Sequence, residues 1–91
     1  MRTEKSTRAA YRKAYNILKV MGVPVFVNDD HAEQGNFGIN AEAPGAEQWV
    51  NYHGNPPGWF FGVSPIVEEV LDQYGLFAEW VNPGCLGVYE K

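Results

Sequence analysis

Apolar residues in the first quarter of the chain recur at the spacing of an amphipathic helix. At about 100° per residue one face collects a single apolar set, namely Ala10, Tyr11, Ala14, Ile17, Leu18 and Met21. Gly22 follows where a C-terminal cap belongs, and Pro24 prevents the helix from continuing. The pattern therefore predicts a helix that begins at about Thr3 or Ser6 and ends at Met21.

Residues 23–63 show the short apolar runs and turn signals of strands. Val23–Asn28 and Phe37–Ala41 predict two antiparallel strands, which flank the polar loop Asp29–Asn36. Gln48–His53 alternates between its two faces and predicts a third strand. Trp59–Val63 is apolar throughout, which fits either a fourth strand buried on both faces or a loop.

The last third of the chain predicts a second helix and a hairpin. Ser64 is suited to cap the helix, Pro65 to occupy its first turn, and Gly75 to end it. Leu76–Val81 and Cys85–Tyr89 predict two strands joined by an Asn-Pro-Gly turn. The predicted order of elements is α-β-β-β-(β)-α-β-β.

This order predicts an α+β fold, in which two helices pack on one face of a mainly antiparallel sheet of four to six strands. The length of 91 residues fits a single domain that spans residues 1–91. We expect it to combine a basic N-terminal helix at about 3–21 with an acidic, aromatic-rich body at 23–91.

The charges divide the chain in the same place. Residues 1–19 hold six basic residues and one acid, a balance of +5, and residues 20–91 hold Lys91 and ten acids, a balance of −9. The predicted helix carries a basic face made of Lys5, Arg8, Arg12 and Lys19. This face is a candidate for phosphate contacts, but the acidic body would repel the same polyanion. Nucleic-acid binding is therefore only our last alternative.

Aromatic residues make up 14% of the chain, more than one small core needs. Since alternation prevents all of them from facing one core, some are expected on a contact surface, where Trp and Tyr are frequent anchors. The candidates for this surface are Trp49, Tyr52, Trp59, Phe60 and Trp80.

The sequence contains no strong catalytic or metal-binding motif. The acidic segment Asp29–Glu33 lacks the alternate oxygen ligands of a calcium loop. The single cysteine, Cys85, excludes an internal disulfide and a cysteine-based zinc site. A thiol pair of Cys85 with His31 or His53 is less expected than an apolar packing role. We therefore expect no catalytic residues, no metal and no cofactor.

These observations favour a small non-enzymatic interaction module, which acts through an aromatic or acidic surface on a protein partner or by self-association as a homodimer. The acidic composition also suggests an accessory protein of a mobile element or an environmental source. The first alternative is a small-molecule-binding protein or small enzyme, whose aromatic pocket would use Tyr52, His53, Trp59 and Glu79. The lone cysteine and the lack of a long apolar run lead us to expect a cytoplasmic protein without membrane contact.

Overall fold

The structure, a computed structural model, describes residues 4–27, 37–54, 56–59 and 61–91, with side chains from residue 9 onward. The predicted loop Asp29–Asn36 lies outside the described residues. The elements in chain order are α1 (Glu4–Met21), β1 (Val25–Val27), β2 (Phe37–Asn40), the 3-10 helix η2 (Ala46–Gln48), α2 (Pro65–Gln73), β3 (Leu76–Asn82) and β4 (Cys85–Glu90).

Both predicted helices are confirmed, and local signals end or begin them as expected. After α1, Gly22 takes a positive φ of 101°, and the amide of Val23 donates to the carbonyl oxygen of Leu18 at 3.0 Å. This is the reversal that lets a glycine satisfy the last carbonyls of a helix. At the start of α2, the Oγ of Ser64 accepts a hydrogen bond of 3.3 Å from the amide of Ile66. In the described part of the chain, neither helix has the length and apolarity needed to cross a bilayer.

The four strands form one antiparallel sheet in the order β1-β2-β4-β3. The strand β4 comes last in the chain but lies between β2 and β3, and all of its pairings are antiparallel. The sheet therefore confirms the predicted mainly antiparallel arrangement, with a strand number at the lower end of the predicted range.

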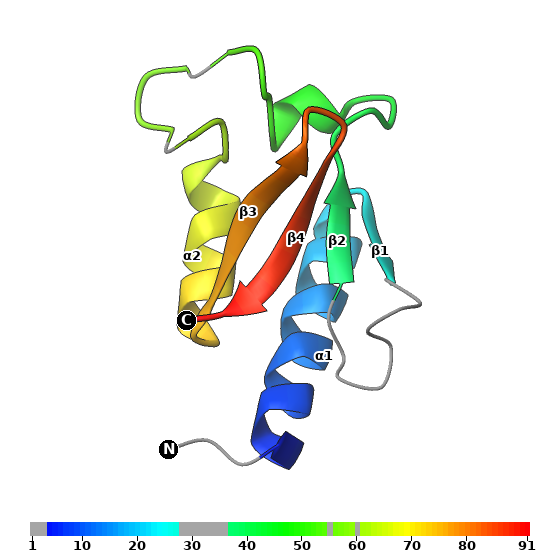
Figure 1. Cartoon of the computed structure of the whole chain (residues 1–91), viewed down its shortest axis with the longest axis vertical. Coiled ribbons are helices and arrows are strands. Elements are labelled where there is room, and N and C mark those ends of the chain that lie inside the picture. Colours follow the sequence, from blue (N-terminus) through cyan, green and yellow to red (C-terminus); the bar gives the residue numbers. More distant parts are fainter. Residues whose placement is uncertain (1–3, 28–36, 55, 60) are drawn as a thin grey trace.

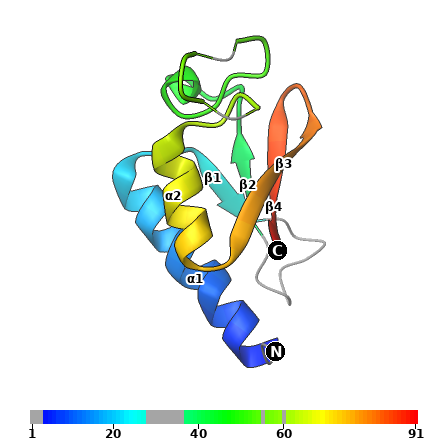
Figure 2. The ribbon, with the colours of Figure 1, turned by 90° about the vertical axis from the view of Figure 1, so that its left-hand side faces the viewer.

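Both helices lie on the same side of the sheet, so the fold has two layers (Figures 1 and 2). Alternate strand residues face the helices, and these inward positions are apolar. The buried core between the layers contains Leu18, Phe37, Ile39, Val67, Leu71, Leu76, Leu86 and Val88. Because β1 and β2 lie near α1 while β3 lies against α2, each helix covers one half of the sheet.

The predicted third strand at Gln48–His53 is wrong. The chain there begins in η2, and the amides of Trp49 and Val50 both donate to the carbonyl oxygen of Ala46 at 2.9 Å. The buried residues Ala46 and Val50 are thus four apart, which is the spacing of a helical turn. Of this segment only Val50 forms a strand-like bridge, and its partner is Val63.

The interpretation of Trp59–Val63 as a strand buried on both faces is also wrong. Phe61 is 75% exposed and lies in a turn with a positive φ of 51°. Val63 is buried and pairs with Val50, so the described residues of this segment form a turn that ends in a single bridge. Phe60 lies outside the described residues. An apolar run by itself does not distinguish a buried strand from a loop that packs only part of its side chains.

Candidate functional site

The strand β3 is the last strand of the sheet on the side of α2. Among the described residues, only β4 pairs with β3, so the other edge of β3 has no neighbouring strand. An edge strand directs alternate backbone N–H and C=O groups away from its sheet, where another chain can pair with them. The edge of β3 is therefore a surface that can form backbone hydrogen bonds.

A groove of about 620 Å³ follows this edge. We call it the edge groove, and it is lined by Phe61, Val63, Glu68, Phe77, Ala78, Glu79, Trp80 and Lys91. Its lining includes four consecutive residues of β3, which alternate between the two faces of the sheet. The groove therefore extends around the edge itself and is not confined to the space between sheet and helix.

The indole of Trp80 fixes the wall of the edge groove that contains Phe61. Its Nε1 donates a hydrogen bond of 2.7 Å to the carbonyl oxygen of Phe61. The ring of Tyr52 stands edge-on to the Trp80 ring, with the ring centroids 5.2 Å apart. These contacts fix Phe61 beside β3 although the two segments are nineteen residues apart in the chain.

The two ends of the loop that carries Phe61 are held together by backbone hydrogen bonds. The amide of Asn51 donates to the carbonyl oxygen of Gly62 at 2.7 Å, and the amide of Ser64 donates to that of Trp49 at 2.8 Å. These two bonds flank the bridge between Val50 and Val63. The closed base explains how a loop without regular strands can present an exposed phenylalanine at a fixed position.

The carboxyl group of Glu68 enters the edge groove from α2. Burial raises the pKa of Glu68, while the positive charge of Lys91 lowers it and the negative charge of Asp72 raises it further. The Nζ of Lys91 forms an exposed ion pair with Asp72. A cation or a hydrogen-bond donor placed in the groove would therefore stabilise the ionised form of the Glu68 carboxyl group.

A second, more open hollow adjoins the groove on α2. It measures about 430 Å³ and is lined by Gly58, Pro65, Glu68, Glu69 and Asp72. Glu68 lines both spaces, so the two adjoin at this residue. Glu79 adds another carboxyl group to the groove, and Lys91 is the one basic residue among the described lining residues. The whole region is thus apolar in its depth and acidic at its border.

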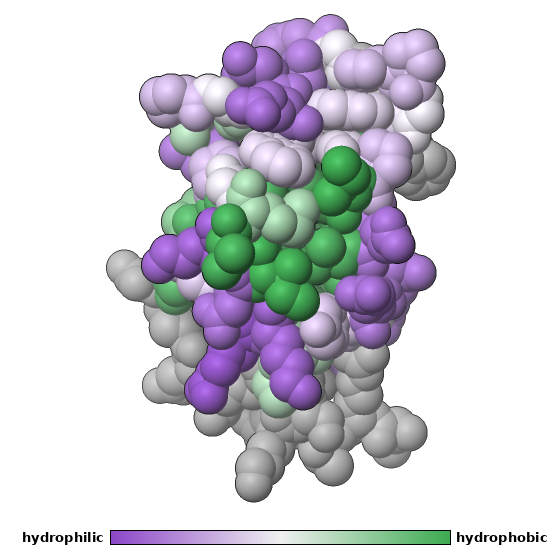
Figure 3. All heavy atoms as spheres, turned by 180° about the vertical axis from the view of Figure 1, so that it is seen from behind, coloured by the Kyte–Doolittle hydropathy of each residue, from purple (hydrophilic) through white to green (hydrophobic). Residues whose placement is uncertain are grey.

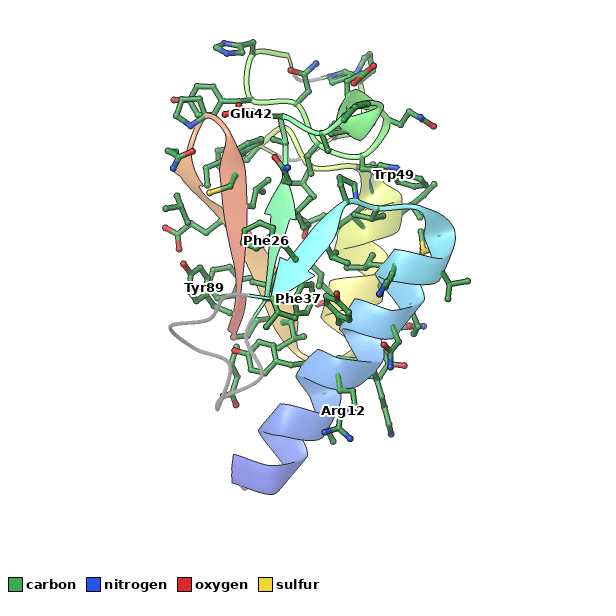
Figure 4. The ribbon with its side chains drawn as sticks, turned by 90° about the vertical axis from the view of Figure 1, so that its right-hand side faces the viewer. Arg12, Phe26, Phe37, Glu42, Trp49 and Tyr89 are labelled. Carbon is green, nitrogen blue, oxygen red and sulfur yellow. The ribbon has the colours of Figure 1, made fainter. Side chains whose placement is uncertain are left out.

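The face of the sheet opposite the helices carries aromatic rings over glycines. Strand pairing places Phe26, Gly38, Gly87 and Glu79 in one row across the four strands. Figure 4 shows Phe26 and Tyr89 on this outer face, with Phe37 on the inner side towards α1. The ring centroid of Phe77 lies 5.8 Å from that of Tyr89. Phe26, Tyr89 and Phe77 thus form an aromatic surface on the outer face, which continues into the edge groove through Phe77.

The five aromatic residues predicted for a contact surface occupy different places. Trp80 lines the groove, and Tyr52 is half exposed and contacts Trp80. Trp49 is partly buried against the core, and Trp59 is partly buried in the loop. Phe60 lies outside the described residues. The structure therefore brings two of the five together at the groove, together with Glu79 from the predicted pocket.

The predicted basic face is described only in part. Arg12 and Lys19 are exposed on α1, and the Nζ of Lys19 lies 5.7 Å from the centre of the Tyr15 ring. The side chains of Lys5 and Arg8 lie outside the described residues. Nucleic-acid binding through this face stays a prediction.

Six of the eight residues that line the edge groove were not anticipated as site residues, among them Phe61, Glu68 and Lys91. Phe61 belonged to the ambiguous apolar run, Glu68 was explained by its place near the helix N-terminus, and Lys91 is remote from both in sequence. No local pattern links them, since they meet only through the packing of α2 and the loop against β3.

Within the described residues, no three His, Cys, Asp or Glu side chains lie together in a way that could hold a metal ion. The acidic segment Asp29–Glu33 lies outside that part. Cys85 is a partly exposed free thiol on the outer face of β4, and His53 is exposed in the loop.

The fold and the groove thus define a two-layer α+β protein with an exposed strand edge. Comparisons with protein-family models, curated proteins and solved structures found no match to this chain.

Proposed function

We propose that this protein is a small interaction module that binds an extended segment of a partner protein in the edge groove. The observation that carries the proposal is the position of the groove along the unpaired edge of β3. A partner strand placed there would extend the sheet and at the same time bury its side chains between Phe61, Trp80 and the start of α2. Strand addition of this kind obtains affinity from main-chain hydrogen bonds and specificity from pockets for alternate side chains.

The lining of the groove indicates the composition of the partner segment. Val63, Ala78 and Trp80 favour apolar side chains at alternate positions of the segment. The carboxyl groups of Glu68, Glu69 and Asp72 favour a lysine or arginine next to these apolar side chains. We therefore expect a segment that combines β-branched or aromatic residues with at least one basic residue.

A display library of random linear peptides tests this proposal. Selection on the purified native protein should enrich peptides with alternating apolar residues and a basic residue. Affinities of the synthesised hits are then measured by calorimetry. Methylation of the backbone nitrogen should abolish binding at every second position of a hit and be tolerated at the positions between, because only one edge of the peptide faces β3.

Two variants of the protein complete the test. Phe61→Gly removes a wall of the groove, and glycine accepts the positive φ of this position, so the fold is retained. Peptide affinity should fall with this variant and stay unchanged with Val20→Ser, which alters an 89% exposed residue of α1. Uniform effects of methylation, unchanged affinity of Phe61→Gly, or a library without binders would each contradict the proposal.

Glu68 supports a second candidate, namely binding of a small aromatic amine. A carboxyl group with a raised pKa in an apolar groove is a feature of ligand sites, since a ligand cation can restore its ionised form. Titration with phenethylamine, followed by NMR, should shift the resonances of Trp80 and Glu68 saturably, and Glu68→Gln should remove the effect. Absence of saturable shifts would leave only the peptide proposal.

A further inference from the structure

The helix layer exposes an apolar patch on the side away from the sheet. Val20 and Ile66 are 89% and 53% exposed, and Ile17, Met21 and Val70 are partly exposed. Figure 3, which views the molecule from behind, shows hydrophobic residues gathered in a continuous patch at the centre of this surface. We call these five residues the helix patch.

Helical spacing explains why the five residues meet. On α1, Ile17, Val20 and Met21 are three and four residues apart, and on α2, Ile66 and Val70 are four apart. The two helices contact each other, so these two rows lie side by side. Glu68 lies on the opposite side of α2 from Val70, towards β3, so the helix patch and the edge groove are separate surfaces.

The patch is bordered by opposite charges on its two sides. Lys13 is four residues before Ile17 and lies on the same side of α1, where it is exposed. Glu69 is three residues after Ile66 on α2 and is also exposed, and it lies between the helix patch and the open hollow next to the edge groove. A surface with a positive and a negative half around an apolar centre is complementary to itself.

In a twofold-symmetric dimer, only one orientation of the two copies brings these opposite charges together. If α1 faced α1 of a second copy, Lys13 would approach the same cation of that copy. If α1 faces α2 of the second copy, the cations of each chain approach the Glu69 side of the other, and this contact occurs twice. An isologous interface repeats each contact in this way, so a favourable pair contributes doubly.

From the helix patch and its two charged borders we infer that the protein forms a homodimer, in which α1 of each copy packs against α2 of the other. The two helix layers become the centre of a four-layer particle, and both sheets and both edge grooves remain on the outside. This surface differs from the aromatic strand surface that the sequence suggested for self-association.

Sedimentation equilibrium over a wide range of concentrations tests the dimer. The native protein should sediment with twice the mass of the chain at high concentration. Val20→Ser should lower the association constant without changing the circular dichroism spectrum, because a side chain that is 89% exposed contributes little to the fold of one copy. A native protein that stays monomeric, or a Val20→Ser dimer of unchanged affinity, would overturn the inference.

Charge reversal tests the orientation. Lys13→Glu and Glu69→Lys should each lower the association constant about tenfold, since each disturbs two symmetric borders. An equimolar mixture of the two variants should regain the association, because every border of the mixed dimer then joins opposite charges. A mixture that associates no better than the separate variants would exclude the packing of α1 against α2.

Discussion

The indole Nε1 of Trp80 donates a hydrogen bond of 2.7 Å to the carbonyl oxygen of Phe61, and this bond ties the edge strand to the loop. Trp80→Phe removes the donor and part of the ring and should lower the free energy of unfolding by about 1–2 kcal/mol. Urea denaturation measures the loss. Trp59→Phe is the matched control. An equal loss in that variant would mean that the hydrogen bond to Phe61 does not contribute to the free energy of unfolding.

Two glycines on the outer face of the sheet should respond differently to a methyl group. A Cβ on Gly38 would lie 2.5 Å from Cζ of Phe26 and 2.8 Å from the carbonyl oxygen of Leu86. The backbone of β4 cannot move without disturbing the sheet. Gly38→Ala should therefore lower the free energy of unfolding by about 1–3 kcal/mol, as measured by urea denaturation.

Gly87 provides the comparison for Gly38. The three atoms nearest to a Cβ at Gly87 all belong to the side chain of Tyr89, whose ring can rotate away. Alanine also reduces the flexibility of the unfolded chain, so Gly87→Ala should be close to neutral. Equal losses for the two alanine variants would show that the backbone contact at Gly38 does not determine its cost.

The cap of α2 should have a measurable effect on stability. Ser64→Ala leaves the amide of Ile66 without its side-chain acceptor and should cost about 1 kcal/mol in urea denaturation. Ser64→Asp supplies another capping oxygen and should retain most of the stability. A loss of the same size in the aspartate variant would point to the burial of Ser64 rather than to capping.

The raised pKa of Glu68 predicts a pH dependence of stability. Because burial raises this pKa, the folded state binds the proton more tightly than the unfolded state does. The resulting stabilisation is complete below the ordinary pKa of a glutamate and is lost as the pH rises through the raised pKa. Glu68→Gln should therefore melt at a higher temperature than the native protein at neutral pH, and the difference should vanish in acid.

Melting curves of the native protein and the variant across this pH range measure the effect. Glu69→Gln, on the exposed neighbour of Glu68, controls for the loss of one negative charge. A difference between Glu68→Gln and the native protein that stays constant with pH would contradict the prediction.

The elements that were predicted correctly depend on signals that act locally in the sequence. The second helix was predicted between Ser64 and Gly75 because its cap, its first-turn proline and its terminal glycine act within a few residues of the chain. The hairpin of β3 and β4 was predicted for the same reason, since its Asn-Pro-Gly turn closes locally. The amide of Gly84 indeed bonds to Oδ1 of Asn82 at 2.8 Å.

The errors concern segments whose structure depends on distant partners. The segment from 48 to 53 is too short for its alternation of apolar and polar residues to distinguish a strand from the helical turn that is present. This turn begins at Ala46 and buries Ala46 and Val50. The edge groove requires knowledge that β4 lies between β2 and β3, because this order alone makes β3 an edge strand. Sequence order does not determine strand order, so neither the groove nor the exposure of Phe61 was predictable from local pattern.

The central place of β4 has a consequence for the synthesis of the protein. A nascent chain that has reached Gly84 contains both strands that flank β4, but the strand that joins them has not yet been made. Until the ribosome adds Cys85–Glu90, Ile39 and Leu76 belong to two unconnected pieces, each with open hydrogen-bonding groups. The sheet is therefore completed only when β4 enters between β2 and β3, and until then the facing edges of these two strands keep unpaired main-chain groups.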